Sequence, residues 1–271
     1  MPKDAVAEYY DANTASFGRT GQGGASIRRA VWSPGVQTRA DSFRSVDARI
    51  LERLRARPSP CRVVDLGCGL GASLLWLRQH VAFEGIGITL SGVQARATQT
   101  AFTGVDGLRC LEASYTDLPA EIADVDVAFA IESFVHAPSA EAFLAPIARA
   151  LRPGGELLIC DDFLGPQHSH HADALDKTRW GWMANCLVLP DDVIALAATH
   201  GLECVANDDL TDFLELGRPR DRLLELVVTL GAPFKPSSWL FRSWVGGVAL
   251  QKCLKKRALE YRLLRFVKRA A

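Results

Sequence analysis

The sequence predicts an α/β fold in which helices cover a mostly parallel sheet of seven strands. The first observation is a short apolar strand beginning at Val63, which ends at Asp65 and continues into a glycine-rich turn and a helix. An apolar strand of this kind suits a parallel sheet, whose strands are buried on both faces. The second observation is that further apolar strands alternate with helical patterns, as in βαβ units. The expected strands are 63–65, 85–91, 108–112, 125–131, 156–160, 204–210 and an antiparallel 259–267.

Composition bounds the class of protein. The 271 residues are 48% hydrophobic and 23% charged, enough to bury a sizeable core. Lys plus Arg and Asp plus Glu are both 31, and this balance argues against nucleic acid as a partner. No apolar run approaches the roughly 18 residues of a membrane span, so we expect no stable membrane insertion. The seven cysteines form no CxxC pair, which favours reduced thiols and a cytoplasmic location.

We expect one domain over residues 1–271. Residues 1–57 would form a helical N-terminal extension, 60–165 the ligand-binding core, 166–258 a helical lid around the sixth strand, and 259–267 the last strand.

The extension and the lid carry their own patterns. A short helix is expected around Tyr9 and Tyr10, a glycine loop at 18–24, and a second helix over 38–54. In the lid, one helix is expected over 223–230, and another starts at Trp239 and breaks at Gly246-Gly247.

Two clusters in the lid invite a functional interpretation. Arg179, Trp180, Trp182 and Met183 would suit a cover over an apolar substrate. His168, His170 and His171 resemble a metal cluster, but no cysteine lies near them and a fourth ligand is missing. We therefore expect a solvated loop and no metal there.

The glycine-rich turn carries the strongest motif, D-L-G-C-G-L-G at residues 65–71. An NAD fingerprint would place its acid about 20 residues after the glycines, and a P-loop would contain Gly-Lys-Ser/Thr. The stretch instead resembles motif I of class I S-adenosylmethionine (SAM)-dependent methyltransferases, a Rossmann-like fold. The resemblance implies that SAM is the cofactor and that Asp65, Gly67, Cys68 and Gly69 contact it. The L-R-P-G-G-x-L-L-I stretch from Leu151 is a second, structural signature of that class.

Two further turns complete the expected cofactor site. G-I-T-L-S-x-x-Q at residues 87–94 resembles a subgroup that includes cyclopropane fatty acid synthases, tocopherol methyltransferases and sterol methyltransferases. The resemblance implies that Thr89 and Gln94 hold the ribose, where many SAM and NAD enzymes use an acid, and Leu90 is expected to contact the cofactor. After the third strand, Ser114 would bond the adenine edge and Tyr115 would stack on the ring. Ile131, which ends the fourth strand, is expected to contact the cofactor too.

The candidate catalytic residues follow the fourth strand. I-E-x-x-x-H-A-P, with Glu132 and His136, resembles a motif of sterol methyltransferases, and Tyr10 lies in a stretch that loosely resembles their tyrosine-rich N-terminal segment. Arg28 and Arg29 stand where those enzymes carry aromatic residues, which argues against a sterol substrate.

These residues suggest chemistry for either kind of acceptor. With an alkene acceptor, aromatic faces such as Tyr10 or Trp180 would stabilise the cation, and Glu132 or His136 would take the proton. With a hydroxyl acceptor, His136 is the expected base.

The function predicted is SAM-dependent methyl transfer to a small lipophilic acceptor, an isoprenoid or another secondary metabolite, with C-methylation favoured over O-methylation. A SAM-dependent cyclopropane synthase and a SAM-binding cyclase are alternatives within the class. A NAD-dependent reductase and a non-catalytic binding domain are alternatives outside it.

Overall fold

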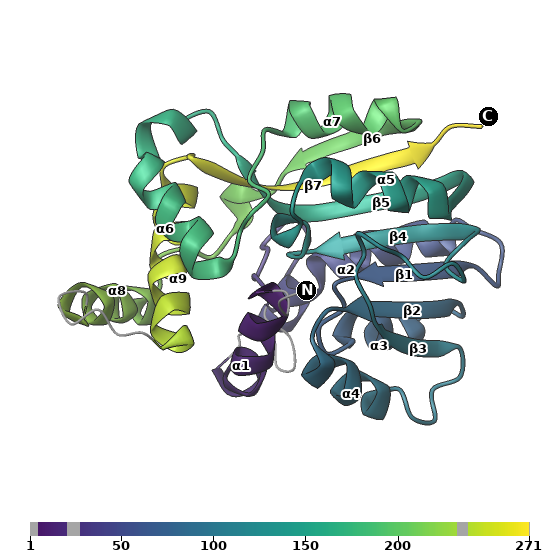
Figure 1. Cartoon of the computed structure of the whole chain (residues 1–271), viewed down its shortest axis with the longest axis horizontal. Helices are drawn as coiled ribbons and strands as arrows, with labels where there is room; N and C mark the ends of the chain where they lie inside the picture. The colour runs from purple at the N-terminus through teal and green to yellow at the C-terminus, as the bar shows by residue number, and fades with distance from the viewer. Residues whose placement is uncertain (1–4, 21–27, 232–237, 271) are drawn as a thin grey trace.

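A seven-stranded sheet organises the chain. The computed structural model describes residues 5–20, 28–231 and 238–270, with only the backbone described over 15–20. The strand order is β3-β2-β1-β4-β5-β7-β6, and β7 alone runs antiparallel to its neighbours β5 and β6 (Figure 1). The strands are β1 (Arg62–Leu66), β2 (Glu84–Thr89), β3 (Leu108–Glu112), β4 (Val125–Ile131), β5 (Leu151–Leu164), β6 (Leu202–Asp209) and β7 (Leu259–Lys268). The predicted mostly parallel sheet is confirmed.

Helices pack on both faces of this sheet. Successive residues of β1 point to opposite faces, so Val63 belongs to one apolar core and Val64 to the other. The first core takes residues from α2 (Arg39–Arg55), α3 (Ala72–Arg78) and α4 (Gly92–Ala101). The second takes residues from α5 (Ala140–Ala150) and α7 (Pro190–Thr199). Burial on both faces explains why the central strands β1 and β4 are mostly apolar.

The fifth strand is longer than its pattern predicts. β5 begins at Leu151, and the Pro153-Gly154 turn lies inside it as an irregularity, where the pairing with β4 shifts register. Asp161 and Asp162 lie within the strand, opposite Arg262 and Tyr261 of β7. The strand therefore brings two adjacent carboxyl groups to the sheet's ligand-facing edge.

The N-terminal helix is also longer than expected. α1 spans Ala5–Thr20, so Gly18, assigned to a loop from the sequence, is helical. The other glycines of that predicted loop lie outside the described residues. Asp11 of α1 accepts a hydrogen bond from the Ser91 hydroxyl at 2.5 Å, and Ser91 is the N-cap of α4. This contact joins the extension to the end of β2.

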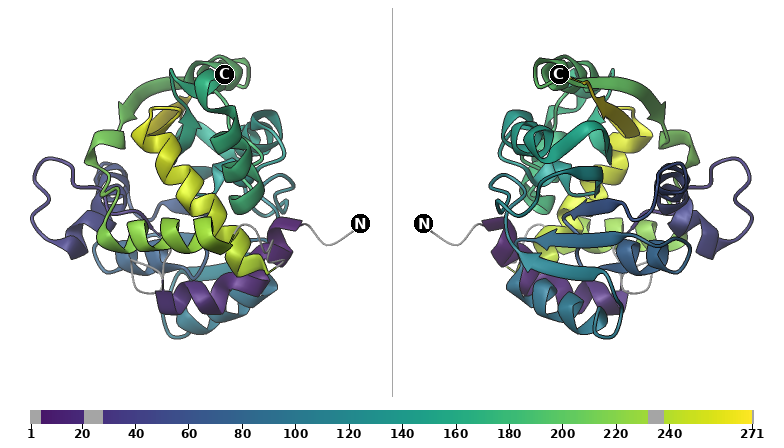
Figure 2. Two further views of the ribbon diagram at one scale, coloured as in Figure 1. Left: turned by 90° about the vertical axis from the view of Figure 1, so that its left-hand side faces the viewer. Right: turned by 90° about the vertical axis from the view of Figure 1, so that its right-hand side faces the viewer.

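Three helices gather at the end of the sheet toward which β4 points (Figure 1). They are α6 (Ala172–Trp182), α8 (Pro219–Gly231) and α9 (Trp239–Lys255). From that side, α9 runs diagonally across the view with α6 and α8 beside it (Figure 2, left). The prediction that Gly246-Gly247 breaks α9 is wrong, because the helix continues through both glycines. Their role is close packing: a Cβ on Gly246 would lie 2.8 Å from the Cα of Gly181 in α6.

Short 3-10 helices complete the chain: η1 (Phe134–His136), η2 (His168–His171) and η3 (Thr211–Phe213). In η2 the His168 ring bonds the Gly165 carbonyl at 2.9 Å and the His170 ring bonds Gln167 at 3.0 Å. Over the described ranges, no three His, Cys, Asp or Glu side chains gather as a metal site would require. Nor does any helix in those ranges combine the length and apolarity needed to cross a membrane.

We predict that Gly246→Ala lowers the free energy of unfolding by about 1–3 kcal/mol, because the new methyl group overpacks the α6–α9 contact. Gly247→Ala is the matched control, since its Cβ would lie at an ordinary 3.5 Å from Trp182. Alanine is more stable than glycine in a helix interior, so this control should leave the free energy of unfolding unchanged or raise it slightly. Urea unfolding measures both variants, and equal effects would contradict the packing argument.

Candidate active site

A pocket opens where the carboxyl ends of the central strands meet α1. Open α/β sheets bind their ligands at this edge. The glycine loop contributes Asp65, Gly67, Cys68 and Gly69 to its lining. The other predicted ligand-binding residues in the lining are Thr89, Leu90, Gln94, Tyr115 and Ile131, and the predicted catalytic residues Tyr10, Glu132 and His136 line it as well. Ser114 does not line this pocket.

The glycine loop leaves room above its backbone. The amides of Gly67 and Cys68 both donate to the Ile88 carbonyl at 2.9 Å, which turns the chain sharply against the end of β2. Gly67 has φ of 99°, and a Cβ there would lie 2.4 Å from the Cβ of Ser133. Gly69 has φ of 55°, and a Cβ there would meet nothing within 4 Å. The loop therefore has the shape of a cradle beneath a ligand.

Two hydrogen-bonded polar side chains lie at the end of β2. The Thr89 hydroxyl donates to the Gln94 side-chain oxygen at 2.8 Å, and both residues are buried. Among the described residues, nothing hydrogen-bonds the amide nitrogen of Gln94, which leaves its two N–H donors for a ligand. The geometry is compatible with a diol held at this point.

Asp65 is a buried carboxyl group beneath the loop. Burial raises its pKa to about 8, while the nearby Arg28 guanidinium lowers it and Asp47 raises it further. Arg28 itself is committed to the buried Asp47 carboxylate, with which it forms an ion pair. Asp65 is therefore only partly compensated, and its protonated form is favoured in the folded protein at neutral pH.

Glu132 is held from two sides. It has φ of 53°, and its Oε1 accepts from the Tyr261 hydroxyl at 3.0 Å and from the Arg29 backbone amide at 3.1 Å. The Arg29 guanidinium bonds both carboxylate oxygens of Asp162 at 2.5 Å and lies over the Tyr261 ring at 4.7 Å. A bidentate pair of this kind is geometrically specific. The Glu132 carboxylate is thus fixed at the pocket wall.

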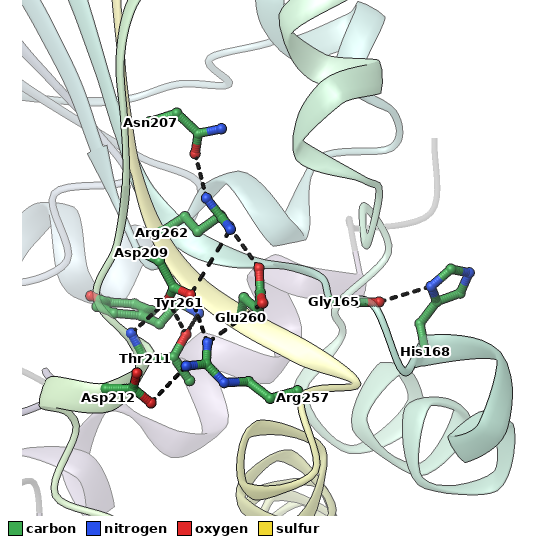
Figure 3. Close-up of polar contacts among 10 residues, drawn as sticks. All are labelled: Gly165, His168, Asn207, Asp209, Thr211, Asp212, Arg257, Glu260, Tyr261 and Arg262. Carbon is green, nitrogen blue, oxygen red and sulfur yellow. Dashed lines mark hydrogen bonds and ion pairs between the residues drawn. The ribbon is translucent and has the colours of Figure 1, made fainter.

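A network of charged side chains positions Tyr261 near the start of β7 (Figure 3). Its backbone amide donates to the Thr211 hydroxyl at 2.9 Å, and that hydroxyl donates to Asp209 at 2.5 Å. Arg257 joins Asp209 and Asp212, each at 2.6 Å. The strand end that carries Tyr261 is therefore tied to the segment after β6.

Tyr10 and His136 form a hydrogen-bonded pair across the pocket. The Tyr10 hydroxyl lies 2.7 Å from His136 Nε2, and His136 Nδ1 lies 3.1 Å from the Met183 carbonyl. Burial raises the pKa of Tyr10 well above its ordinary value, so the phenol keeps its proton and donates it. Since a carbonyl can only accept, Nδ1 carries the imidazole proton and Nε2 is the acceptor.

Two residues that the sequence analysis placed in the site do not line the pocket. The Ser114 hydroxyl bonds Thr116 at 2.7 Å rather than facing the pocket. Trp180 is 49% exposed and packs under the Arg242 guanidinium, so it is wrongly predicted as an aromatic face of the site. Trp182, two residues on, lines the pocket instead. Helical geometry explains the exchange, because residues two apart point to different sides of α6.

Sequence reasoning missed the residues that support the site. The sequence pattern marks Arg28 and Arg29 only as departures from an aromatic stretch, and it assigns no role in the site to Asp162 or Tyr261. Arg29 bonds Asp162 and Tyr261 bonds Glu132, and in both pairs the partner lies more than 100 residues away in the sequence. An acid pair at the end of an apolar strand was the one available signal for Asp162.

Comparison with known proteins agrees with the fold. The methyltransferase domain family matches residues 64–159. An O-methyltransferase of Aspergillus nomiae is 35% identical over 180 residues, covering 64% of this chain and 80% of that protein. A 24-methylenesterol C-methyltransferase of rice is 26% identical over 190 residues, covering 66% of this chain and 52% of the rice protein. The structure of a cyclopropane synthase from Mycobacterium tuberculosis superposes with a TM-score of 0.77 at 18% identity, over 98% of this chain and 99% of that one.

Sheet order, glycine loop and pocket define a Rossmann-like enzyme that binds a nucleoside-type cofactor at its strand ends. The chain belongs to the class I SAM-dependent methyltransferases. The predicted class, fold and cofactor are thereby confirmed.

We predict that Asp65→Asn flattens the pH dependence of stability. With a folded pKa of about 8 and an unfolded pKa of about 4, native Asp65 holds a proton that the unfolded chain has lost. Asp65 therefore makes stability fall as pH rises between these values, by up to about 1.4 kcal/mol per pH unit. Urea unfolding at pH 6, 7 and 8 should show a shallower decline for the variant than for the wild type. Parallel curves would show that Asp65 is ionised in the folded protein.

Proposed function

We propose that this methyltransferase acts on a small apolar acceptor and that Tyr10 and His136 take the acceptor's proton. Asp65, the Gly67–Gly69 loop, Thr89 and Gln94 would hold SAM, whose sulfonium supplies an already activated methyl group. The space above Gly69 and the uncommitted donors of Gln94 fit such a group. With the donor activated, the protein's main contribution is to align the acceptor.

The observation that carries the proposal is the 2.7 Å contact between Tyr10 and His136 at the wall of the same pocket. The acceptor hydroxyl would pass its proton to the Tyr10 oxygen as Tyr10 passes its own to His136 Nε2. The imidazolium that results would keep its Nδ1–H bond to the Met183 carbonyl. Proton transfer by a positioned group of this kind contributes about 10²–10⁴-fold to a rate.

An oxygen acceptor is the first candidate. The Aspergillus nomiae relative is an O-methyltransferase, and it has the higher identity of the two relatives described. The neutral Tyr10–His136 pair suits removal of one hydroxyl proton. Apolar lining from Val6, Tyr9 and Leu250 favours an acceptor with a lipophilic body, such as an isoprenoid or another secondary metabolite.

A carbon acceptor is the second candidate, favoured by the position of Glu132. Methylation of an alkene leaves a cation, and the Tyr10 ring and the Glu132 carboxylate both line the pocket where it would form. The carboxylate would stabilise the cation or take its proton. The rice relative is a C-methyltransferase, and the I-E-x-x-x-H-A-P motif supports the same chemistry.

We predict that Gln94→Leu weakens binding of S-adenosylhomocysteine (SAH) about ten-fold, because hydrogen bonds from the amide to the ribose are lost. Gln99→Leu is the matched control on the same helix, since Gln99 bonds the Cys110 carbonyl at 3.3 Å and does not line the pocket. Calorimetry measures both. Unchanged SAH affinity in Gln94→Leu would mean that Gln94 only braces the end of β2.

We predict that His136→Ala and Tyr10→Phe each lower kcat by about 10²-fold or more while the KM for SAM stays unchanged. Trp180→Ala, outside the pocket, should keep wild-type turnover. The assay is methyl-labelled SAM with a panel of isoprenoids, phenols and sterols.

We predict that Glu132→Gln distinguishes an oxygen acceptor from a carbon acceptor in the same assay. It should be tolerated with an oxygen acceptor and should abolish turnover with a carbon acceptor, and the carbon-13 shift of the transferred methyl group identifies the bond formed. Full activity in His136→Ala, Tyr10→Phe and Glu132→Gln together would refute the proposed proton transfer.

A further inference from the structure

A second cavity adjoins the cofactor pocket. It lies between α8, α9 and residues 214–218, and it shares part of its lining with the first pocket, including Glu132, Trp182 and Leu250. Because the same side chains face both spaces, a molecule in this cavity can reach the region of Glu132. We refer to the second cavity as the α8–α9 chamber.

The chamber changes character along α9. Leu240, Trp244 and Val248 line its first part, and Lys252 and Lys255 line its last part. Steps of three or four residues place these side chains on one face of the helix. From Trp244 to Lys255 the helix rises roughly 16 Å, at about 1.5 Å per residue. The chamber thus offers an apolar wall that leads to a basic end.

The basic end carries charge that the protein does not neutralise. Eight Lys or Arg side chains line the chamber against four Asp or Glu. Arg28, Arg29 and Arg218 are paired with acids. Across the described part of the chain, Arg222, Lys252, Lys255 and Lys256 make no ion pair, and Glu225 is the one acidic lining residue of which the same holds. The whole chain has no net charge, so this excess is local.

A purely structural role for these lysines makes a different prediction. Lys252 and Lys255 occupy the last turn of α9, where cations stabilise the helix dipole. That role affects stability and gives no selectivity among ligands. Charge selectivity of binding therefore separates the two roles.

We infer that the α8–α9 chamber holds the methyl acceptor and that the acceptor is an amphiphilic acid, with a carboxylate or phosphate at one end. Its apolar body lies along Trp244 and Val248, its anionic group lies at Lys252 and Lys255, and its reacting end passes Glu132 into the cofactor pocket that Tyr10 and His136 line. This inference rests on the proposed apolar acceptor and adds the anionic group.

The test is calorimetry with four ten-carbon probes in the presence of SAH: decanoate, decyl phosphate, decanol and decyltrimethylammonium. We expect decanoate or decyl phosphate to bind about ten-fold more tightly than decanol and the cation. Whichever anion binds better distinguishes a carboxylate from a phosphate. In the double variant Lys252→Glu, Lys255→Glu the order should reverse, with the cation preferred. Lys177→Glu on α6, a lysine outside the chamber, should keep the wild-type order.

Each other outcome has a defined meaning. Equal binding of all four probes would overturn the anionic acceptor and leave the apolar acceptor standing. Binding of none would overturn both. If the double variant Lys252→Glu, Lys255→Glu still preferred the anions, the inference would also be overturned, because the anionic group would then lie elsewhere. The rise in melting temperature with SAH verifies that each variant is folded.

Discussion

Pairing of buried charges is the constraint on which the site depends. The segment at Arg28 and Arg29 carries two guanidinium groups into the interior, where they meet Asp47 and Asp162. Removing one partner of such a buried pair costs about 3–5 kcal/mol, because the other charge is left uncompensated. The pairs therefore hold Arg28 and Arg29 in one place. Since the Arg29 amide and side chain also contact Glu132, that placement fixes the carboxylate at the pocket wall.

Hydrogen bonds bring further distant elements to the same edge of the sheet. α1 reaches the cofactor loop region through Asp11 and Ser91, and reaches the catalytic loop through Tyr10 and His136. β7 contributes Tyr261, which the Arg257 network ties to β6. The floor of the pocket comes from one continuous run of βα units, and the rest of its lining includes residues of α1, α6 and α9.

The chemistry of the pocket divides between a neutral pair and an anchored carboxylate. Tyr10 stays protonated because burial raises its pKa, and its hydroxyl lies 2.7 Å from His136 Nε2, which suits the proposed transfer of a hydroxyl proton. Glu132 is surrounded by donors from Tyr261 and Arg29, which suits a carboxylate that faces developing positive charge. The basic end of the α8–α9 chamber concerns the inferred anionic group of the acceptor.

The sequence by itself determined the sheet, the glycine loop and twelve of the residues that line the pocket. These features depend on local backbone chemistry: Gly67 and Gly69 adopt positive φ, Thr89 ends β2, and Glu132 directly follows β4. Only the tertiary structure decided which side chains support them. Arg29 and Asp162 meet across 133 residues, and no local pattern encodes that contact. The continuity of α9 through Gly246, and the exchange of Trp180 for Trp182, were likewise settled by how α6 and α9 pack. Close approach of two helices rewards glycine in a way that intrinsic helix propensity alone does not predict.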